Sequence, residues 1–326
     1  MRLVVEDKGA LTFEDGSPVR AASAIVPFGG GFLVAQDDAT HAAWLRPGEG
    51  RGKGPGGCSA VRVVDAVDRL EVFSERAGTK HLKPDFEAAC AVTVGGAEAA
   101  LLLGSGSSPA RTRASLLRLD AAGEPYFTMA ELAPVYRAVA AAMGLRDDQL
   151  NLEGACVVGD RLRWFQRANL AAGAPTASAD VDLAALLAAV AGRGEPTGTA
   201  GDVRHYDLGM IAGVALAVTD AVRVGDGLVL VSAVAEDTPN AIDDGPLVGA
   251  ALALLDGNGV REMAALPGPY KVEGLAVVEP VADGVRVVAV VDADDPQAPS
   301  QRLTLRVSYQ IRPGEVVATT YGPVRM

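Results

Sequence analysis

A short apolar phrase with a small or acidic residue near its start recurs along the chain. The clearest copies are Leu152–Val158 and Lys271–Val278, with Asp85–Val92 as a looser one; Arg20–Val26 and Ile211–Leu216 keep the small and apolar residues without the acid. These phrases have no helical period and turn residues bound them, so each predicts a buried strand. Their lead positions are 21, 87, 153, 212 and 273. A nearly fixed interval of this size is typical of a repeat architecture.

More strands follow each phrase. Second strands are expected after short glycine-containing turns, at residues 32–35, 99–103, 161–165, 227–231 and 285–291. Third strands alternate between apolar and polar residues at 114–119 and 302–307, and outer fourth strands are expected at 61–64, 203–206, 260–263 and 316–319. Four-stranded units repeated in a closed ring predict an all-β fold, a β-propeller.

Five lead phrases indicate five blades in one domain that spans residues 1–326, with six blades as the alternative. We expect both ends of the sequence to close the ring, with Leu3–Val5 and Val316–Thr320 completing blades. Two alanine-rich stretches break the β pattern, Met129–Met143 and Leu183–Ala191. Each ends at glycine, so each predicts a short helix that decorates the outer part of a blade.

Composition narrows the possible partners. The chain has 326 residues, 49% of them hydrophobic, and a net charge of −12. This acidity argues against nucleic acid or an anionic membrane as a partner, because both require basic surfaces. The amino terminus lacks the organisation of a signal peptide, and no apolar stretch reaches membrane-spanning length, so we expect a cytoplasmic protein. The three cysteines are spaced as neither a metal cluster nor a disulfide framework and are expected to be buried.

Propeller geometry brings distant residues to one place. Loops that enter innermost strands and loops that leave second strands share one face, around the mouth of the central channel. Glu87, Glu153 and Glu273 open innermost strands, and polar residues end the second strands. The set expected at this mouth further includes Asp37, Lys83, Ser105, Arg167, Asn169, Lys271 and Asp294.

Several oxygen ligands around one point are what Ca²⁺ or Mg²⁺ requires. The expected metal ligands are Glu87, Glu153, Glu273, Asn169 and Asp294. A carboxylate outside the metal sphere, Glu153 or Glu273, or the nearby His81, could serve as an acid or base. The alternative is structural: each glutamate pairs with Lys83, Arg167 or Lys271 and locks the ring. No motif indicates an organic cofactor.

A small polar ligand would meet other groups at the same mouth. The stretch from Gly104 to Arg113 is rich in glycine and serine, and its backbone N–H groups could form an anion nest reinforced by Arg111. Ser105 and Arg111, with Lys83 and Arg167, are therefore the expected ligand contacts. A flexible loop without ligand is the alternative for this stretch.

The phrases Lys83–Glu87, Gly104–Ser107, Leu150–Ala155 and Val272–Leu275 resemble an uncharacterised bacterial propeller family. More distantly, the Glu-Gly strand openings resemble phytase-like and esterase-like propeller proteins. The resemblance implies a propeller and a Ca²⁺-dependent phosphoesterase or esterase, and it transfers no catalytic residue.

Two functions therefore stay open. The first is a metal-dependent hydrolase of a small ester, lactone or phosphoester at the channel mouth. The second is a non-catalytic scaffold that binds a small polar molecule or a protein there.

Overall fold

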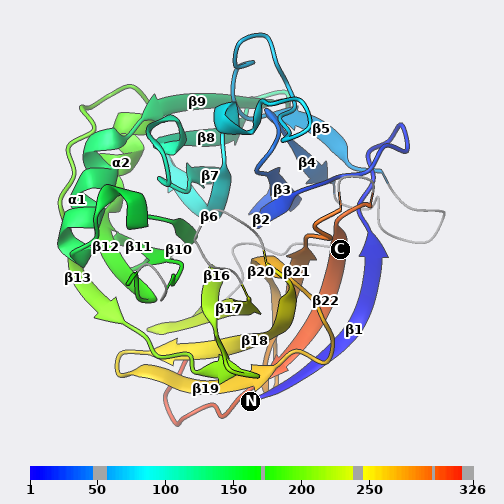
Figure 1. Cartoon of the computed structure of the whole chain (residues 1–326), viewed down its shortest axis with the longest axis vertical. Coiled ribbons are helices and arrows are strands. Elements are labelled where there is room, and N and C mark those ends of the chain that lie inside the picture. Colours follow the sequence, from blue (N-terminus) through cyan, green and yellow to red (C-terminus); the bar gives the residue numbers. More distant parts are fainter. Residues whose placement is uncertain (47–56, 170–172, 238–244, 296–297, 318–326) are drawn as a thin grey trace.

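Five four-stranded antiparallel sheets stand around a central channel, each with its first strand innermost (Figure 1). The computed structural model describes residues 1–46, 57–169, 173–237, 245–295 and 298–317. The five-bladed propeller expected from the repeats is thereby confirmed, and the six-bladed alternative is wrong.

Four blades are continuous in sequence, and their strands run outward in chain order. Blade 1 contains β2 (Ala22–Phe28), β3 (Gly31–Gln36), β4 (His41–Leu45) and β5 (Ser59–Arg62). Blade 2 contains β6 (Phe86–Val94), β7 (Ala97–Gly104), β8 (Arg113–Leu119) and β9 (Pro125–Glu131). Blade 3 contains β10 (Leu152–Val158), β11 (Arg161–Gln166), β12 (Ala177–Asp182) and β13 (Ala200–His205). Blade 4 contains β16 (Ala217–Gly225), β17 (Leu228–Glu236), β18 (Leu247–Asp256) and β19 (Gly259–Ala265).

Blade 5 closes the ring from the two ends of the chain. Its strands β20 (Val272–Val281), β21 (Gly284–Val291) and β22 (Gln301–Ser308) are followed by β1 (Arg2–Ala10) in the outermost place. The expected role of Leu3–Val5 is confirmed. The expected strand at Val316–Thr320 is wrong where the structure describes it, because Val317 makes an isolated bridge to Gly225; residues 318–320 lie outside the described part.

Two corrections concern local structure. The phrase at Ile211–Leu216 is not an innermost strand: it forms a small hairpin of β14 (Met210–Ile211) and β15 (Val214–Ala215), and the innermost strand β16 follows it. The first predicted helix begins at Ala133 and not at Met129, because Met129 belongs to the strand β9. The alanine-rich pattern did not reveal this strand.

Both helices exist on the outer part of the ring (Figure 1). Helix α1 (Ala133–Met143) ends at Gly144, which takes the left-handed conformation with φ 69°, and α2 (Leu183–Val190) begins at Asp182, whose side chain caps the N–H of Ala185. Tyr136 of α1 packs edge-on against the buried Trp164 of β11, with ring centroids 4.7 Å apart. The helices therefore thicken the apolar core between blades 2 and 3.

Every innermost strand carries a bulge at the same place. Near the start of each innermost strand, pairing with the second strand skips one residue, and these residues are Ser23, Glu87, Glu153, Thr219 and Glu273. A bulge leaves one residue unpaired in the ladder and re-aims its side chain. These five residues therefore occupy equivalent positions in the five blades.

Candidate functional site

A cavity of about 330 Å³ lies at the channel mouth, and the bulges help to line it. Four of the five bulged residues contribute to its wall, Ser23, Glu87, Glu153 and Glu273. Thr219 is buried and turns away: its hydroxyl donates a 2.5 Å hydrogen bond to the carbonyl of Val272 in the next blade. Ser23 makes the equivalent bond to the carbonyl of Phe86, also 2.5 Å. The bulge therefore serves both as a link between blades and as a platform for carboxylates.

Carboxylates outnumber cations among the described lining residues. Nine acids and five bases line the cavity: Asp37, Asp85, Glu87, Glu153, Glu236, Asp237, Glu273, Asp292 and Asp294 against Lys80, Lys83, Arg111, Arg167 and Lys271.

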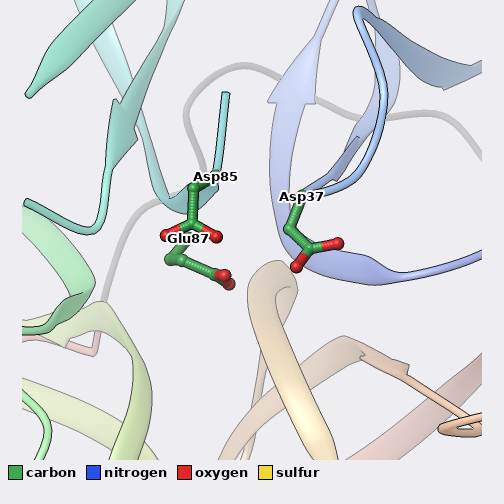
Figure 2. Close-up of side chains that lie close together, drawn as sticks. All are labelled: Asp37, Asp85 and Glu87. Carbon is green, nitrogen blue, oxygen red and sulfur yellow. The ribbon is translucent and has the colours of Figure 1, made fainter. Parts of the chain in front are cut away.

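Lys83 is shared by three of these acids. Its ammonium contacts Asp37, lies 2.6 Å from Asp85 and is 4.0 Å from Glu87. Figure 2 shows Asp85 and Glu87, at the start of β6, facing Asp37 from blade 1. Asp85 has further partners, since Arg111 lies 3.1 Å away and Ser105 donates a hydrogen bond to it. Among these three acids, Glu87 is therefore the one whose negative charge is least balanced by nearby cations.

A second network links blades 3, 4 and 5. Arg167 binds both carboxylate oxygens of Glu153, at 3.0 and 3.1 Å, and contacts Glu236. Lys271 lies 2.8 Å from Asp294, 3.2 Å from Glu236 and 3.5 Å from Glu273. Here too one lysine serves three acids.

Burial and like charge shift the pKa values at the mouth. Burial, with the charges of Asp85 and Asp37, raises the pKa of Glu87 well above its usual range. Burial also raises the pKa of Glu273 well above its usual range, against the influence of Lys271. Burial would raise the pKa of Asp85, but Lys83 and Arg111 outweigh it, and the pKa is lowered. The pKa values of these adjacent carboxyls are therefore shifted in opposite directions, that of Asp85 down and that of Glu87 up.

Two further acids titrate in the physiological range. Burial and the neighbouring Asp37 raise the pKa of Asp38 to about 7. Burial and Asp294 raise the pKa of Asp292 to about 6. Because Asp292 lines the cavity, the charge of the cavity wall becomes more negative as pH rises past about 6.

One wall of the cavity differs from the rest. Gly213, Val214 and Ala215 of the β14–β15 hairpin line it together with Ala217 and Val234 of blade 4. Ile211 of the hairpin packs closely on Gly249 of β18. A Cβ added at Gly249 would lie 2.9 Å from the side chain of Ile211. An otherwise charged cavity thus has an uncharged, largely aliphatic side.

The structure brings together most of the residues expected at the mouth. Those that line the cavity are Asp37, Lys83, Glu87, Arg111, Glu153, Arg167, Asn169, Lys271, Glu273 and Asp294. Two do not line it. His81 is exposed in the short 3₁₀ helix Lys80–Leu82, and Ser105 is buried behind Asp85.

Sequence reasoning missed Glu236 and the hairpin wall. Glu236 belongs to blade 4 and the hairpin directly precedes this blade, whose innermost strand was sought at Ile211–Leu216. A signal existed in Ala217–Ala221, since Thr219 is 66 residues beyond Glu153, the interval that separates Glu153 from Glu87.

The residues that could hold a metal ion differ from the expected set. Asp37, Asp85 and Glu87 offer oxygens that all lie within 4.8 Å of one another. Such a group suits a hard divalent cation. The Lys83 ammonium contacts the same three carboxylates, so an ion would have to displace it.

Comparison with known proteins identifies the family. Residues 79–296 match the model of DUF6910, a family of unknown function, and the chain belongs to this family. The expectation of an uncharacterised family is confirmed. A search of curated proteins finds no match.

Solved structures give only weak similarity. A GDP-Man-dependent mannosyltransferase from Leishmania mexicana, MPT-1, is 10% identical with a TM-score of 0.44, over 97% of this chain and 94% of that one. A glycosyl hydrolase from Bacteroides ovatus is 9% identical with a TM-score of 0.39, over 93% and 89%. TM-scores this low carry no argument about function. Within the described residues, no helix is both long and apolar enough to cross a membrane.

Proposed function

We propose that the channel mouth binds a small polar molecule that carries a positively charged group, such as an organic amine. The observation that carries the proposal is the sharing of Lys83 among Asp37, Asp85 and Glu87. Lys83 and Arg111 supply two positive charges for three carboxylates, and burial with the charges of Asp85 and Asp37 raises the pKa of Glu87 well above its usual range. A cationic ligand would supply the missing charge and lower the pKa of Glu87.

The shape of the cavity adds a second requirement. Val214 and Ala215 offer no hydrogen-bonding side chain, and they face a cavity rich in carboxylates. A ligand with a short hydrocarbon part beside its charged group would satisfy both walls. The volume of about 330 Å³ suits a molecule of small size.

Binding of a cationic ligand is expected to release a proton from the protein. Because the ligand favours ionised Glu87, its binding releases a proton, and affinity rises with pH until Glu87 is ionised in the free protein. Calorimetric titration with small primary and quaternary amines, in buffers of different ionisation enthalpy, measures that release. Neutral alcohols of the same shape serve as matched ligands and are expected to bind much more weakly.

A matched pair of variants locates the site. Glu87→Gln keeps size and removes the ionisable group, so amine affinity should fall and proton release should disappear. Glu98→Gln changes an exposed residue in β7 and should leave both unchanged. Equal binding of amines and alcohols, or unchanged proton release in Glu87→Gln, contradicts the proposal.

The second candidate is a metal-dependent hydrolase of a small ester, lactone or phosphoester. The proximity of Asp37, Asp85 and Glu87 favours it, with Ca²⁺ or Mg²⁺ as the expected ion. Thermal unfolding of metal-stripped protein with each ion tests it, since an ion that binds only the folded state raises the midpoint. A selective rise, abolished in Asp85→Asn, supports this candidate and justifies an esterase and phosphatase screen. No rise with any ion rejects it.

A further inference from the structure

A second cavity, of about 300 Å³, lies further along the channel. It starts two residues beyond the bulge on every innermost strand. Ile25 follows Ser23, Ala89 follows Glu87, and the other three strands contribute Ala155, Ala221 and Leu275 in the same way. The channel is therefore divided lengthwise into a charged mouth and a different compartment below it.

The side chains of this lower cavity are nearly all uncharged. Aliphatic residues predominate, joined by the thiols of Cys90 and Cys156. Both cysteines are free and buried, and burial raises their pKa values, that of Cys156 to about 12, so the thiols stay neutral. The charged pair at its edge is self-compensating, because Arg223 lies 2.5 Å from Asp226.

Hydrogen-bonding groups in this cavity come from the backbone. Each innermost strand is paired on one side only, with the second strand of its blade. Its other edge faces the channel and leaves N–H and C=O groups without ladder partners. The wall thus combines aliphatic side chains with a few neutral donors and acceptors.

The chain itself restricts access from below. Val316 lines the cavity, its carbonyl accepts a 3.3 Å hydrogen bond from the N–H of Asp226, and Val317 bridges Gly225. Val316 therefore forms part of the wall at this end of the cavity.

We propose that the lower channel cavity is a binding site for a small, uncharged, mainly apolar molecule with one or two hydrogen-bonding groups. Water in such a compartment has few side-chain partners, so replacing it with an apolar ligand is favourable. A charged ligand would find no counter-charge, because Arg223 and Asp226 neutralise each other. The ligand class is therefore opposite to that of the mouth.

The neutral fluorophore N-phenyl-1-naphthylamine tests the proposal, with indole as competitor. We expect saturable fluorescence enhancement that indole reverses. Ala91→Leu fills the cavity from β6 and should weaken probe binding by about tenfold or more. Val157→Phe fills it from β10 and provides a second variant if the first does not fold.

Two controls separate this site from other surfaces. Ala97→Leu places the same leucine at an exposed position of β6's partner strand β7, outside the cavity, and should leave probe affinity unchanged. Glu87→Gln alters only the mouth and should also leave it unchanged. Absence of saturable binding, or equal binding by wild type and both folded cavity-filling variants, overturns the proposal.

Discussion

Asp220 in β16 accepts a 2.6 Å hydrogen bond from the backbone N–H of Leu275 in β20, and so joins the innermost strands of blades 4 and 5. Burial raises the pKa of Asp220 well above its usual range. The folded state therefore favours the neutral acid. Its contribution to stability is full below about pH 4, the pKa of an unfolded aspartate, and is lost as pH rises toward the folded pKa.

Asp220→Asn removes this ionisation and keeps the acceptor oxygen. We expect the variant to match the wild type near pH 4 and to lose less stability as pH rises. Denaturation midpoints measured from pH 4 to pH 9 check this. Identical pH profiles for the two proteins would show that Asp220 does not carry the effect.

Lys83→Met should destabilise the protein strongly. It leaves Asp37, Asp85 and Glu87 without their shared cation, and loss of one partner of a buried ion pair costs about 3–5 kcal/mol. Part of this loss should be recovered at low pH, where the carboxyls are protonated. Urea unfolding at pH 5 and pH 8 measures both effects.

Lys80→Met is the matched control for Lys83→Met. Lys80 pairs with Glu75, whose side chain is 78% exposed, at 3.2 Å. Such a surface pair contributes about 0–1 kcal/mol. Equal destabilisation by the two substitutions would contradict the buried network described at the mouth.

Gly154→Ala should destabilise the joint between blades 3 and 4. A Cβ at Gly154 would lie 2.9 Å from the backbone nitrogen of Ala221, which cannot move without shifting β16. We expect a loss of about 1–3 kcal/mol in the free energy of unfolding. Gly201→Ala, where a Cβ meets nothing within 4 Å, should cost much less, and a similar loss at both positions would refute the steric argument.

Removal of residues 1–10 should open the ring. The deletion takes away β1 and leaves β22 as an unpaired edge, an arrangement prone to aggregation. We expect a large fall in thermal stability and concentration-dependent association, measured by light scattering. A synthetic peptide of residues 1–10 should restore stability in trans; a deletion variant as stable as the full chain would contradict this role of β1.

The fold was predictable because propeller blades repeat one hydrophobic pattern. Glu87, Glu153 and Glu273 carry a recognisable acid at the bulge, and they set the period correctly. Blade 4 was misplaced because Thr219 stands where blades 2, 3 and 5 have an acid, while Ile211–Leu216 resembles the repeated phrase. The repeat could thus be placed correctly where a glutamate marks the bulge, and it was misplaced in blade 4, where the bulge residue is Thr219.

The residues of the candidate site were predictable, as was the pairing of its three glutamates with Lys83, Arg167 and Lys271; the further partners of each cation were not. Strand ends identify residues that meet at the mouth, and Lys83, Arg167 and Lys271 were expected there. Which further acids each cation contacts depends on side-chain directions set by the bulges and on the length of β17, which brings Glu236 into contact with Arg167 and Lys271. Neither is encoded in spacing alone.

The place of β1 beside β22 has a consequence for biosynthesis. Arg2 pairs with Ser308, so β1 is synthesised before the other described strands, and its partner β22 is synthesised after them. During that interval it must remain in water without associating with other nascent chains. The composition of β1 favours its solubility while it is unpaired, because four of its nine residues, Arg2, Glu6, Asp7 and Lys8, are charged. The final step of folding would then be the capture of this charged strand by a nearly finished ring, and its rate would report ring closure directly.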